Sequence, residues 1–183
     1  MTPKIITPKI ISTETIYEGR VFDVRIARIC EGENEYSREI VAHHGSAVIV
    51  PVFADNTVAL VRQYRHAAKK YLLEIPAGTL EEDESPEEGA KREVEEEIGA
   101  AAGKVEKLTE FFVSPGFLTE KMYVFLATDL RESEQNLDKD EFLSIEKFTF
   151  QQIFELIKNG EIEDAKTMVG VILAGARFGF IFK

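Results

Sequence analysis

Residues 78–100 read GTLEEDESPEEGAKREVEEEIGA. This stretch predicts a helix, and its start and its end are marked more clearly than those of any other helix expected in the chain. Ser85 is a favourable N-cap residue, Pro86 suits the first helical position, and Glu88 completes an S-x-x-E capping box. We therefore expect a helix from Pro86 to Ile98, preceded by a loop.

The sequence also marks the buried side and the C-terminal end of this helix. Ala90, Val94 and Ile98 repeat every four residues and give the helix an apolar side to bury. Gly99 supplies the left-handed residue that ends it.

Four glutamates, at positions 93, 95, 96 and 97, fill the last turn and a half of the helix. Acidic groups at a helix C-terminus are each unfavourable by a few tenths to about 1 kcal/mol, and like charges at i,i+4 add a similar penalty. Glu93, Glu96 and Glu97 share one face of the helix. Carboxylates crowded on one face suit a hard divalent cation such as Mg²⁺, so we interpret the turn as a metal site and not as a solvated charged surface.

The composition of the 183-residue chain is that of a globular protein, with 44% hydrophobic and 10% aromatic residues. Its net charge of -11 argues against binding to a nucleic-acid backbone. Cys30 is the only cysteine, which excludes an intrachain disulfide and a cysteine-based zinc cluster. No apolar run approaches the roughly 18 residues of a membrane helix and no signal-peptide core is present, so we expect a soluble cytoplasmic protein without a membrane partner.

Apolar runs predict strands on both sides of the helix. Phe22, Val24 and Ile26 form one face of a half-buried strand, and a turn at 31–34 leads to a second strand at 36–41, so a hairpin is expected. Further strands are predicted at 47–53, 58–61, 72–75, 111–113, 122–126 and around Phe148, and helices near 154–157 and 168–176.

Two segments are expected outside this regular structure. Residues 2–11 read TPKII twice, and Pro3 and Pro8 favour an extended edge segment or a loose arm. Residues 130–140 are polar without periodicity and predict a loop. Strands outnumber helices, and no linker rich in Gly, Ser or Pro divides the chain. We therefore expect an α/β or α+β fold, with a mixed sheet covered by helices in a three-layer α/β/α arrangement.

The spacing of charged residues in 78–100 resembles the Nudix box, G-x5-E-x7-R-E-U-x-E-E-x-G-U, where U is a bulky aliphatic residue. The matching residues are Gly78, Glu84, Arg92, Glu93, Val94, Glu96, Glu97, Gly99 and Ala100. Only Ala100 departs, being small where Ile, Leu or Val is usual. Fixed residue types at fixed spacing make the resemblance specific. It implies a Nudix-type α/β/α sandwich with a mixed β-sheet, plus an N-terminal antiparallel β region.

Segments outside the box resemble the ADP-ribose pyrophosphatase branch of this family: RQYR at 62–65, EIPAG at 74–78, SPGF at 114–117 and DAKT at 164–167. Pro115 lies sixteen residues beyond Gly99, the spacing of a proline that marks ADP-sugar preference in this branch. The resemblance implies Mg²⁺-dependent hydrolysis of the pyrophosphate bond of ADP-ribose to AMP and ribose 5-phosphate. GDP-mannose or NADH as the substrate, and a non-catalytic ADP-ribose-binding module, remain alternatives.

Carried onto this chain, the resemblance implies roughly two or three Mg²⁺ or Mn²⁺ ions per site. Glu93 and Glu97 are the expected principal metal ligands, Glu96 assists from the same face, and the main-chain carbonyl of Ala77 is a further ligand. Arg92 is expected to hold a glutamate in place by a charge-assisted hydrogen bond, and so to contribute to catalysis with Glu96 and Glu97.

The resemblance places the base that activates water outside the box, on the acidic loop 137–142. Glu141 is the first choice because glutamate is the usual residue, and Asp140 and Asp138 are its alternatives.

The resemblance further implies substrate contacts at Arg38, Glu39, Arg65, Pro115, Gly116 and Glu120. Arg65 is expected at the diphosphate or terminal ribose. Arg38 and Glu39 match a strand that in this branch reaches into the partner subunit's site, which implies a domain-swapped homodimer. Residues 1–42 are accordingly expected to form an N-terminal β region for dimerisation, and residues 43–183 the Nudix hydrolase domain.

The remaining histidine and cysteine residues lack metal-ligand spacing. His43, His44 and His66 are expected at the surface or in the core, and Cys30 as a packed strand residue.

Overall fold

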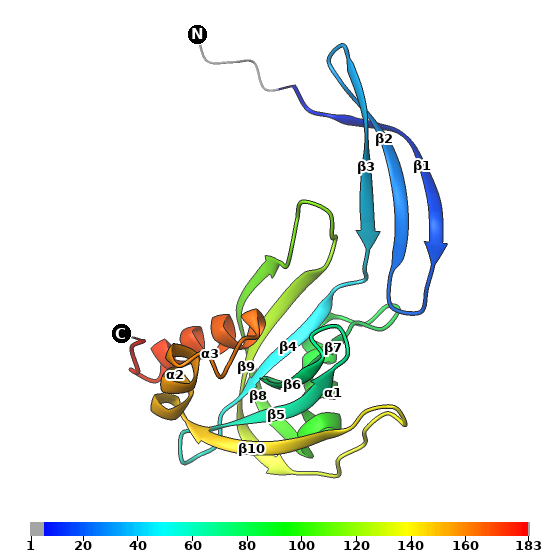
Figure 1. Cartoon of the computed structure of the whole chain (residues 1–183). Coiled ribbons are helices and arrows are strands. Elements are labelled where there is room, and N and C mark those ends of the chain that lie inside the picture. The colour runs from blue at the N-terminus through cyan, green and yellow to red at the C-terminus, as the bar shows by residue number, and fades with distance from the viewer. Residues whose placement is uncertain (1–5, 183) are drawn as a thin grey trace. The chain divides into compact units, whose positions relative to one another are not determined.

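The computed structural model describes residues 6–182, and Figure 1 shows the order of its strands and helices along the chain. The chain divides into two compact units, each described by itself. The first comprises the described residues up to Gly45 together with Phe112–Lys121. The second comprises Ser46–Phe111 and the described residues from Met122 onward. The predicted extended segment at Pro3 lies outside the described residues.

The first unit contains a three-stranded antiparallel sheet in the order β1-β2-β3, formed by β1 (Lys9–Glu18), β2 (Asp23–Glu31) and β3 (Asn34–Ala42). The predicted hairpin is confirmed: Glu31 pairs with Asn34, and Gly32 between them has φ of 66°, which favours glycine. From Lys9 onward the N-terminal segment is an edge strand, one of the two expected alternatives.

The second unit contains two sheets. The first, in the order β7-β4-β9-β8, is formed by β7 (Ala77–Thr79), β4 (Ser46–Pro51), β9 (Lys121–Glu132) and β8 (Ala100–Phe112). β4 pairs antiparallel with β7 and parallel with β9, so this sheet is mixed, as predicted. The other, in the order β10-β5-β6, is antiparallel and is formed by β10 (Leu143–Thr149), β5 (Thr57–Arg65) and β6 (Lys70–Glu74).

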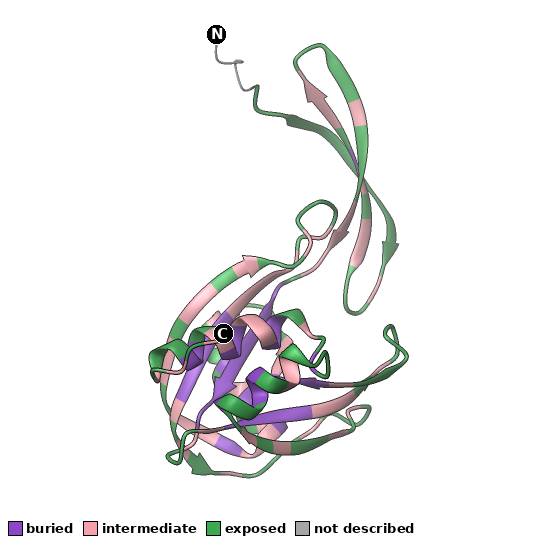
Figure 2. Ribbon diagram, turned by 60° about the vertical axis from the view of Figure 1, so that its left-hand side comes forward, coloured by how far each residue is buried: buried purple, intermediate pink, exposed green. Residues whose placement is uncertain are grey.

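Alternate residues of β4 pack into two different clusters, because successive side chains of a strand point to opposite faces. One cluster contains β4 residues and residues of α1 (Pro86–Ile98): Ala47, Ile49, Ala90 and Val94. The other contains β4 residues and residues of α3 (Ala165–Arg177): Val48, Val50, Val171 and Ala174. Figure 2 shows this buried strand in purple. The central strand is thus covered on both faces by helices, which confirms the layered α/β arrangement.

Helix α2 (Phe150–Lys158) contributes the fully buried Phe150 and Ile153 to the second cluster. The C-terminal segment joins it through aromatic rings, since Phe180 stacks on Phe150 with ring centroids 5.0 Å apart. Both helices predicted beyond residue 150 are therefore present. No helix formed by residues 6–182 is long and apolar enough to cross a membrane.

Two predicted boundaries were wrong. β8 begins at Ala100, directly after the helix, and not at residue 111. Its first residues are small or polar and mostly half-buried or exposed, so no apolar alternation marks them. β9 continues to Glu132, which places the start of the predicted 130–140 loop in a strand, where Leu130 packs against the α1 cluster.

Candidate active site

The N-terminus of α1 is fixed by the predicted capping box. The Ser85 hydroxyl accepts the Glu88 N–H at 3.3 Å, and the Glu88 carboxylate accepts the Ser85 N–H at 3.1 Å. At the other end Gly99 has φ of 62° and donates its N–H to the Glu95 carbonyl. The helix limits predicted from the sequence are confirmed at both ends.

The C-terminal turn of α1 contains no basic residue, so its carbonyls need other donors. They come from the segment after β9. Gln135 Nε2 donates to the Glu97 carbonyl at 2.6 Å, the Asn136 N–H to the Glu96 carbonyl at 3.0 Å, and the Ser133 N–H to the Gly99 carbonyl at 2.8 Å. This segment leads directly into the acidic loop. The sequence predicted only an irregular loop here, because hydrogen bonds of this kind leave no periodic pattern.

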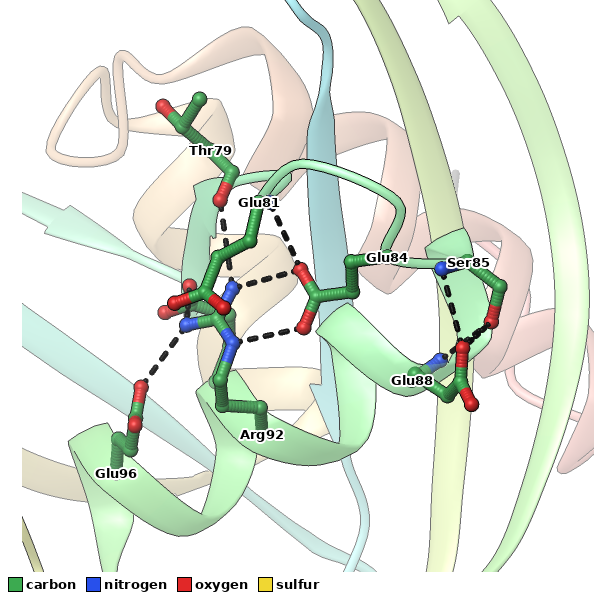
Figure 3. Close-up of polar contacts among 8 residues, drawn as sticks. Thr79, Glu81, Glu84, Ser85, Glu88, Arg92 and Glu96 are labelled. Atoms are coloured by element: carbon green, nitrogen blue, oxygen red, sulfur yellow. Dashed lines mark hydrogen bonds and ion pairs between the residues drawn. The ribbon is translucent and has the colours of Figure 1, made fainter.

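Arg92 connects the loop before α1 to the acidic face of the helix (Figure 3). Its guanidinium forms two bonds to Glu84, Nε to Oε1 at 2.8 Å and Nη2 to Oε2 at 3.0 Å. Nη1 donates to Glu93 Oε1 at 2.7 Å and to Glu96 Oε2 at 2.9 Å. The hydrogen bonds from Arg92 hold the pKa of Glu84 below its ordinary value. Arg92 thus orients three carboxylates at once.

Glu93 and Glu97 are buried, with 7% and 3% of their surface exposed. Burial raises the pKa of Glu93 to about 7, although Arg92 opposes the shift. Burial, with the nearby charges of Glu93 and Glu141, raises the pKa of Glu97 well above its ordinary value, against the Ala77 N–H and Arg65. The two carboxylates thus lie in a water-poor site where the nearby positive charge is too small to balance their negative charge.

The surroundings of these glutamates fit a divalent cation. Glu97 Oε2 is buried and has no hydrogen-bond partner among the described residues, whereas Oε1 accepts the Ala77 N–H at 3.4 Å. Gly78 lies directly against Glu93. Among residues 6–182, no three His, Cys, Asp or Glu side chains already converge as a metal cage, and Arg92 binds two of the expected ligands. A hard cation would satisfy the orphaned oxygen and offset the excess charge.

Arg65 lies at the end of β5 and forms a two-point ion pair with the buried Glu74, Nε to Oε1 and Nη2 to Oε2, both at 2.8 Å. Its positive charge also acts on Glu97. The predicted substrate residue Arg65 is therefore held beside the acidic face by Glu74, which is not among the residues predicted for the site.

The acidic loop lies between β9 and β10. The Glu141 N–H donates to the Asp138 carbonyl at 3.0 Å, which closes a turn. Leu143 pairs with Gln63, so Glu141 lies just beyond the paired region, near the strand end that carries Arg65. The charge of Glu141 acts on both Glu93 and Glu97. The second unit therefore brings together Glu93, Glu96, Glu97, Arg92, Ala77, Arg65 and Glu141.

The remaining predicted residues belong to the first unit. Arg38 and Glu39 lie on β3, with the Arg38 guanidinium 4.3 Å from the centre of the Tyr36 ring. The others lie in the connection between β8 and β9: Pro115, Gly116 and Glu120. The substrate contacts of these five residues stay predictions.

Residues 43–169 of the chain match a family model described as "NUDIX domain". The matched segment includes α1, the loop before it and the acidic loop.

Three of the sequence relatives carry different names. "ADP-ribose pyrophosphatase" of Bacillus subtilis (strain 168) is 37% identical over 92% of both chains, and "Methanol dehydrogenase activator" of Bacillus methanolicus is 36% identical over 92% of both. "GDP-mannose pyrophosphatase" of Enterobacter sp. (strain 638) is 35% identical over 69% of this chain and 70% of its own length.

A solved structure described as "Crystal structure of ADP compounds hydrolase" matches with a TM-score of 0.84 over 96% of both chains. At 22% identity this likeness shows a shared fold.

Proposed function

This chain belongs to the NUDIX-domain family, and from that membership we propose that it hydrolyses the pyrophosphate bond of ADP-ribose, giving AMP and ribose 5-phosphate. The observation that carries the proposal is a buried oxygen of Glu97 that has no hydrogen-bond partner within residues 6–182, beside a second buried glutamate, Glu93. Such a face suits cations that can be shared with a diphosphate. The substrate is inferred from the B. subtilis relative named ADP-ribose pyrophosphatase.

We propose Mg²⁺, or Mn²⁺, as the cofactor, with roughly two or three ions per site. Glu93, Glu96, Glu97 and the Ala77 carbonyl would hold them. When bound, such ions offset the charge of the diphosphate, polarise the phosphoryl group and lower the pKa of water. Arg92 keeps Glu93 and Glu96 on one side of the helix through its hydrogen bonds.

Glu141 is the proposed base that removes a proton from the attacking water, with Asp140 and Asp138 as alternatives. Its support is electrostatic proximity, since its charge acts on both buried glutamates. Neutral isosteres test the choice: Glu141→Gln should lower kcat by roughly 100-fold or more, and Asp140→Asn and Asp138→Asn should not. A larger loss in either aspartate variant would assign the base to that residue.

Arg65 is proposed to bind the diphosphate through the guanidinium N–H groups that Glu74 does not use. Arg38, Glu39, Pro115, Gly116 and Glu120 are the further proposed substrate contacts.

The central test mixes purified protein, Mg²⁺ and ADP-ribose and measures AMP and ribose 5-phosphate. Product formation should require the metal, and Glu97→Gln should lower the rate by several orders of magnitude with the fold retained. A protein that releases no AMP from ADP-ribose, or a fully active Glu97→Gln variant, would contradict the proposal.

GDP-mannose is a second candidate substrate, because the chain also matches a relative named GDP-mannose pyrophosphatase. A competition panel of ADP-ribose, GDP-mannose and NADH decides between them. Comparable kcat/KM for GDP-mannose and ADP-ribose would move the assignment from ADP-sugars to nucleotide sugars in general.

We also propose a homodimer, domain-swapped through the N-terminal strands. The exposed apolar side chains of the first unit support it: Ile10, Ile16 and Tyr17 are 64%, 54% and 56% exposed. Light scattering measures the mass of the protein in solution and so tests the dimer. Mixing the Arg38→Ala variant with the Glu97→Gln variant tests the domain swap. A shared site predicts that the mixture is more active than either variant alone, while a monomer or an inactive mixture would overturn it. The cytoplasmic location stays a prediction from the sequence.

A further inference from the structure

A buried lysine and a buried glutamate lie behind Arg65 and have no role in the reaction proposed above. Glu74 is 1% exposed and Lys166, at the start of α3, is 7% exposed. Charged residues are almost never this buried unless they are paired. Lys166 Nζ donates to Glu74 Oε2, the same oxygen that accepts Arg65 Nη2. One carboxylate therefore binds two cations: Lys166, which is buried, and Arg65, which lies at the site.

Asp164 completes a balanced group of four charges. Its Oδ1 lies 3.1 Å from Lys166 Nζ, and its Oδ2 accepts the Thr167 N–H at 2.9 Å as the N-cap of α3. The two cations and two carboxylates sum to zero, which limits the cost of burying them. Burial raises the pKa of Glu74, but Arg65 and Lys166 outweigh it, so this pKa lies below its ordinary value and Glu74 is ionised.

The same helix start is tied to the loop that precedes α1. Thr167 Oγ1 accepts the Ile75 N–H at 2.9 Å and donates to Asp164 Oδ2 at 2.5 Å. Two residues beyond Ile75, the Ala77 N–H donates to Glu97. The N-terminus of α3 thus fixes the end of β6, from which both the Glu74 carboxylate and the Ala77 segment extend.

We propose that Lys166 is a positioning residue for the diphosphate: by fixing the Glu74 carboxylate, it holds the Arg65 guanidinium with its unused N–H groups presented to the substrate. The inference rests on the proposed function. A two-point ion pair fixes the plane of a guanidinium only where the carboxylate cannot rotate. Lys166 restrains the rotation of Glu74 because it holds one of its oxygens from inside the protein. Arg65 itself is 40% exposed at its side chain and has room to move once that restraint is lost.

The first test is Lys166→Met, which keeps the stem of the side chain and removes the charge. KM for ADP-ribose should rise about 10–100-fold, the effect of one charge-assisted hydrogen bond, with kcat within a few-fold of wild type. Lys158→Met is the matched control, because Lys158 forms an exposed ion pair with Glu155 on α2, away from Arg65 and the start of α3. Its KM should be unchanged. An unchanged KM in Lys166→Met would overturn the proposal.

A double variant separates positioning from stability. Lys166→Met alone leaves Glu74 buried with one cation fewer and should lower Tm. Adding Glu74→Leu replaces the buried pair by apolar groups and should restore Tm. KM should stay raised in the double variant, since Arg65 has lost its anchor. If KM returns to the wild-type value together with Tm, Lys166 is only structural and the proposal fails.

An NMR measurement that needs no substrate turnover tests this proposal independently of the proposed function. The Arg65 Nε–H, assigned by its absence in Arg65→Lys, should give a slowly exchanging NMR signal in the wild type. In Lys166→Met that signal should broaden or exchange faster, while the Arg92 signal should not change. Inorganic pyrophosphate with Mg²⁺ should shift the wild-type Arg65 signal. An Arg65 signal that is the same in both proteins contradicts positioning, whereas absence of hydrolysis alone contradicts only the proposed function.

Discussion

Gly78 lies so close to Glu93 that a Cβ atom on residue 78 would be 1.8 Å from Glu93 Oε1. Real Cβ atoms do not approach other atoms this closely, so any side chain at position 78 must displace the carboxylate. The glycine at the start of the Nudix box is therefore explained by the space that one proposed metal ligand occupies.

Gly78→Ala should reduce kcat by roughly 100-fold, because a displacement of about 1 Å at a reacting site can cost that much. The protein should remain folded by circular dichroism, since Glu93 can move toward solvent. Gly160→Asn is the control: a Cβ there meets nothing within 4 Å, and asparagine tolerates its φ of 73°. Normal activity in Gly78→Ala would show that the position of Glu93 does not matter for the reaction.

Gln135→Ala should lower stability by about 1 kcal/mol, because the Glu97 carbonyl loses its donor at 2.6 Å. The acidic loop that follows residue 136 should also become less ordered, so kcat should fall several-fold. Gln151→Ala, on the exposed face of α2, should change neither quantity. Urea unfolding and steady-state kinetics measure the two effects. If kcat is unaffected, this tether does not position the loop.

The metal-free protein should lose stability as pH rises through about 7, because the folded-state pKa of Glu93 lies at about 7, above its unfolded value. Glu97 shifts in the same direction. Between the unfolded and folded pKa values the folded protein binds more protons, so stability is greatest at the acidic end of that range. Tm in EDTA should thus be higher near pH 6 than near pH 8. The difference should shrink in Glu93→Gln, and an equal difference in that variant would refute the assignment.

Mg²⁺ should raise Tm in the wild type, since a ligand at 100 times its Kd stabilises the fold by about 2.7 kcal/mol. In Glu97→Gln the metal effect should largely disappear. In EDTA the same variant should be more stable than the wild type, because the cost of burying an acid whose pKa burial raises is removed. Calorimetry with and without Mg²⁺ checks both statements. An undiminished Mg²⁺ effect in Glu97→Gln would place the ion elsewhere.

Local rules were enough for much of the fold. The capping box at Ser85 and the left-handed Gly99 fixed both ends of α1, and alternation predicted the hairpin of β2 and β3. β8 was missed over most of its length because its residues after Gly99 are small or charged, and its strand conformation depends on tertiary pairing and not on propensity.

The chemistry available to this protein follows from its amino-acid sequence alone. Charged residues at fixed spacing on one helix face follow from helical geometry, and that geometry is local. How those residues are used depends instead on the tertiary fold. Burial of Glu93 and Glu97, the hold of Gln135 on the helix end and the anchoring of Arg65 by Glu74 and Lys166 join segments far apart in the chain. Burial and electrostatic coupling depend on which segments meet in space, and no spacing along the chain contains that information.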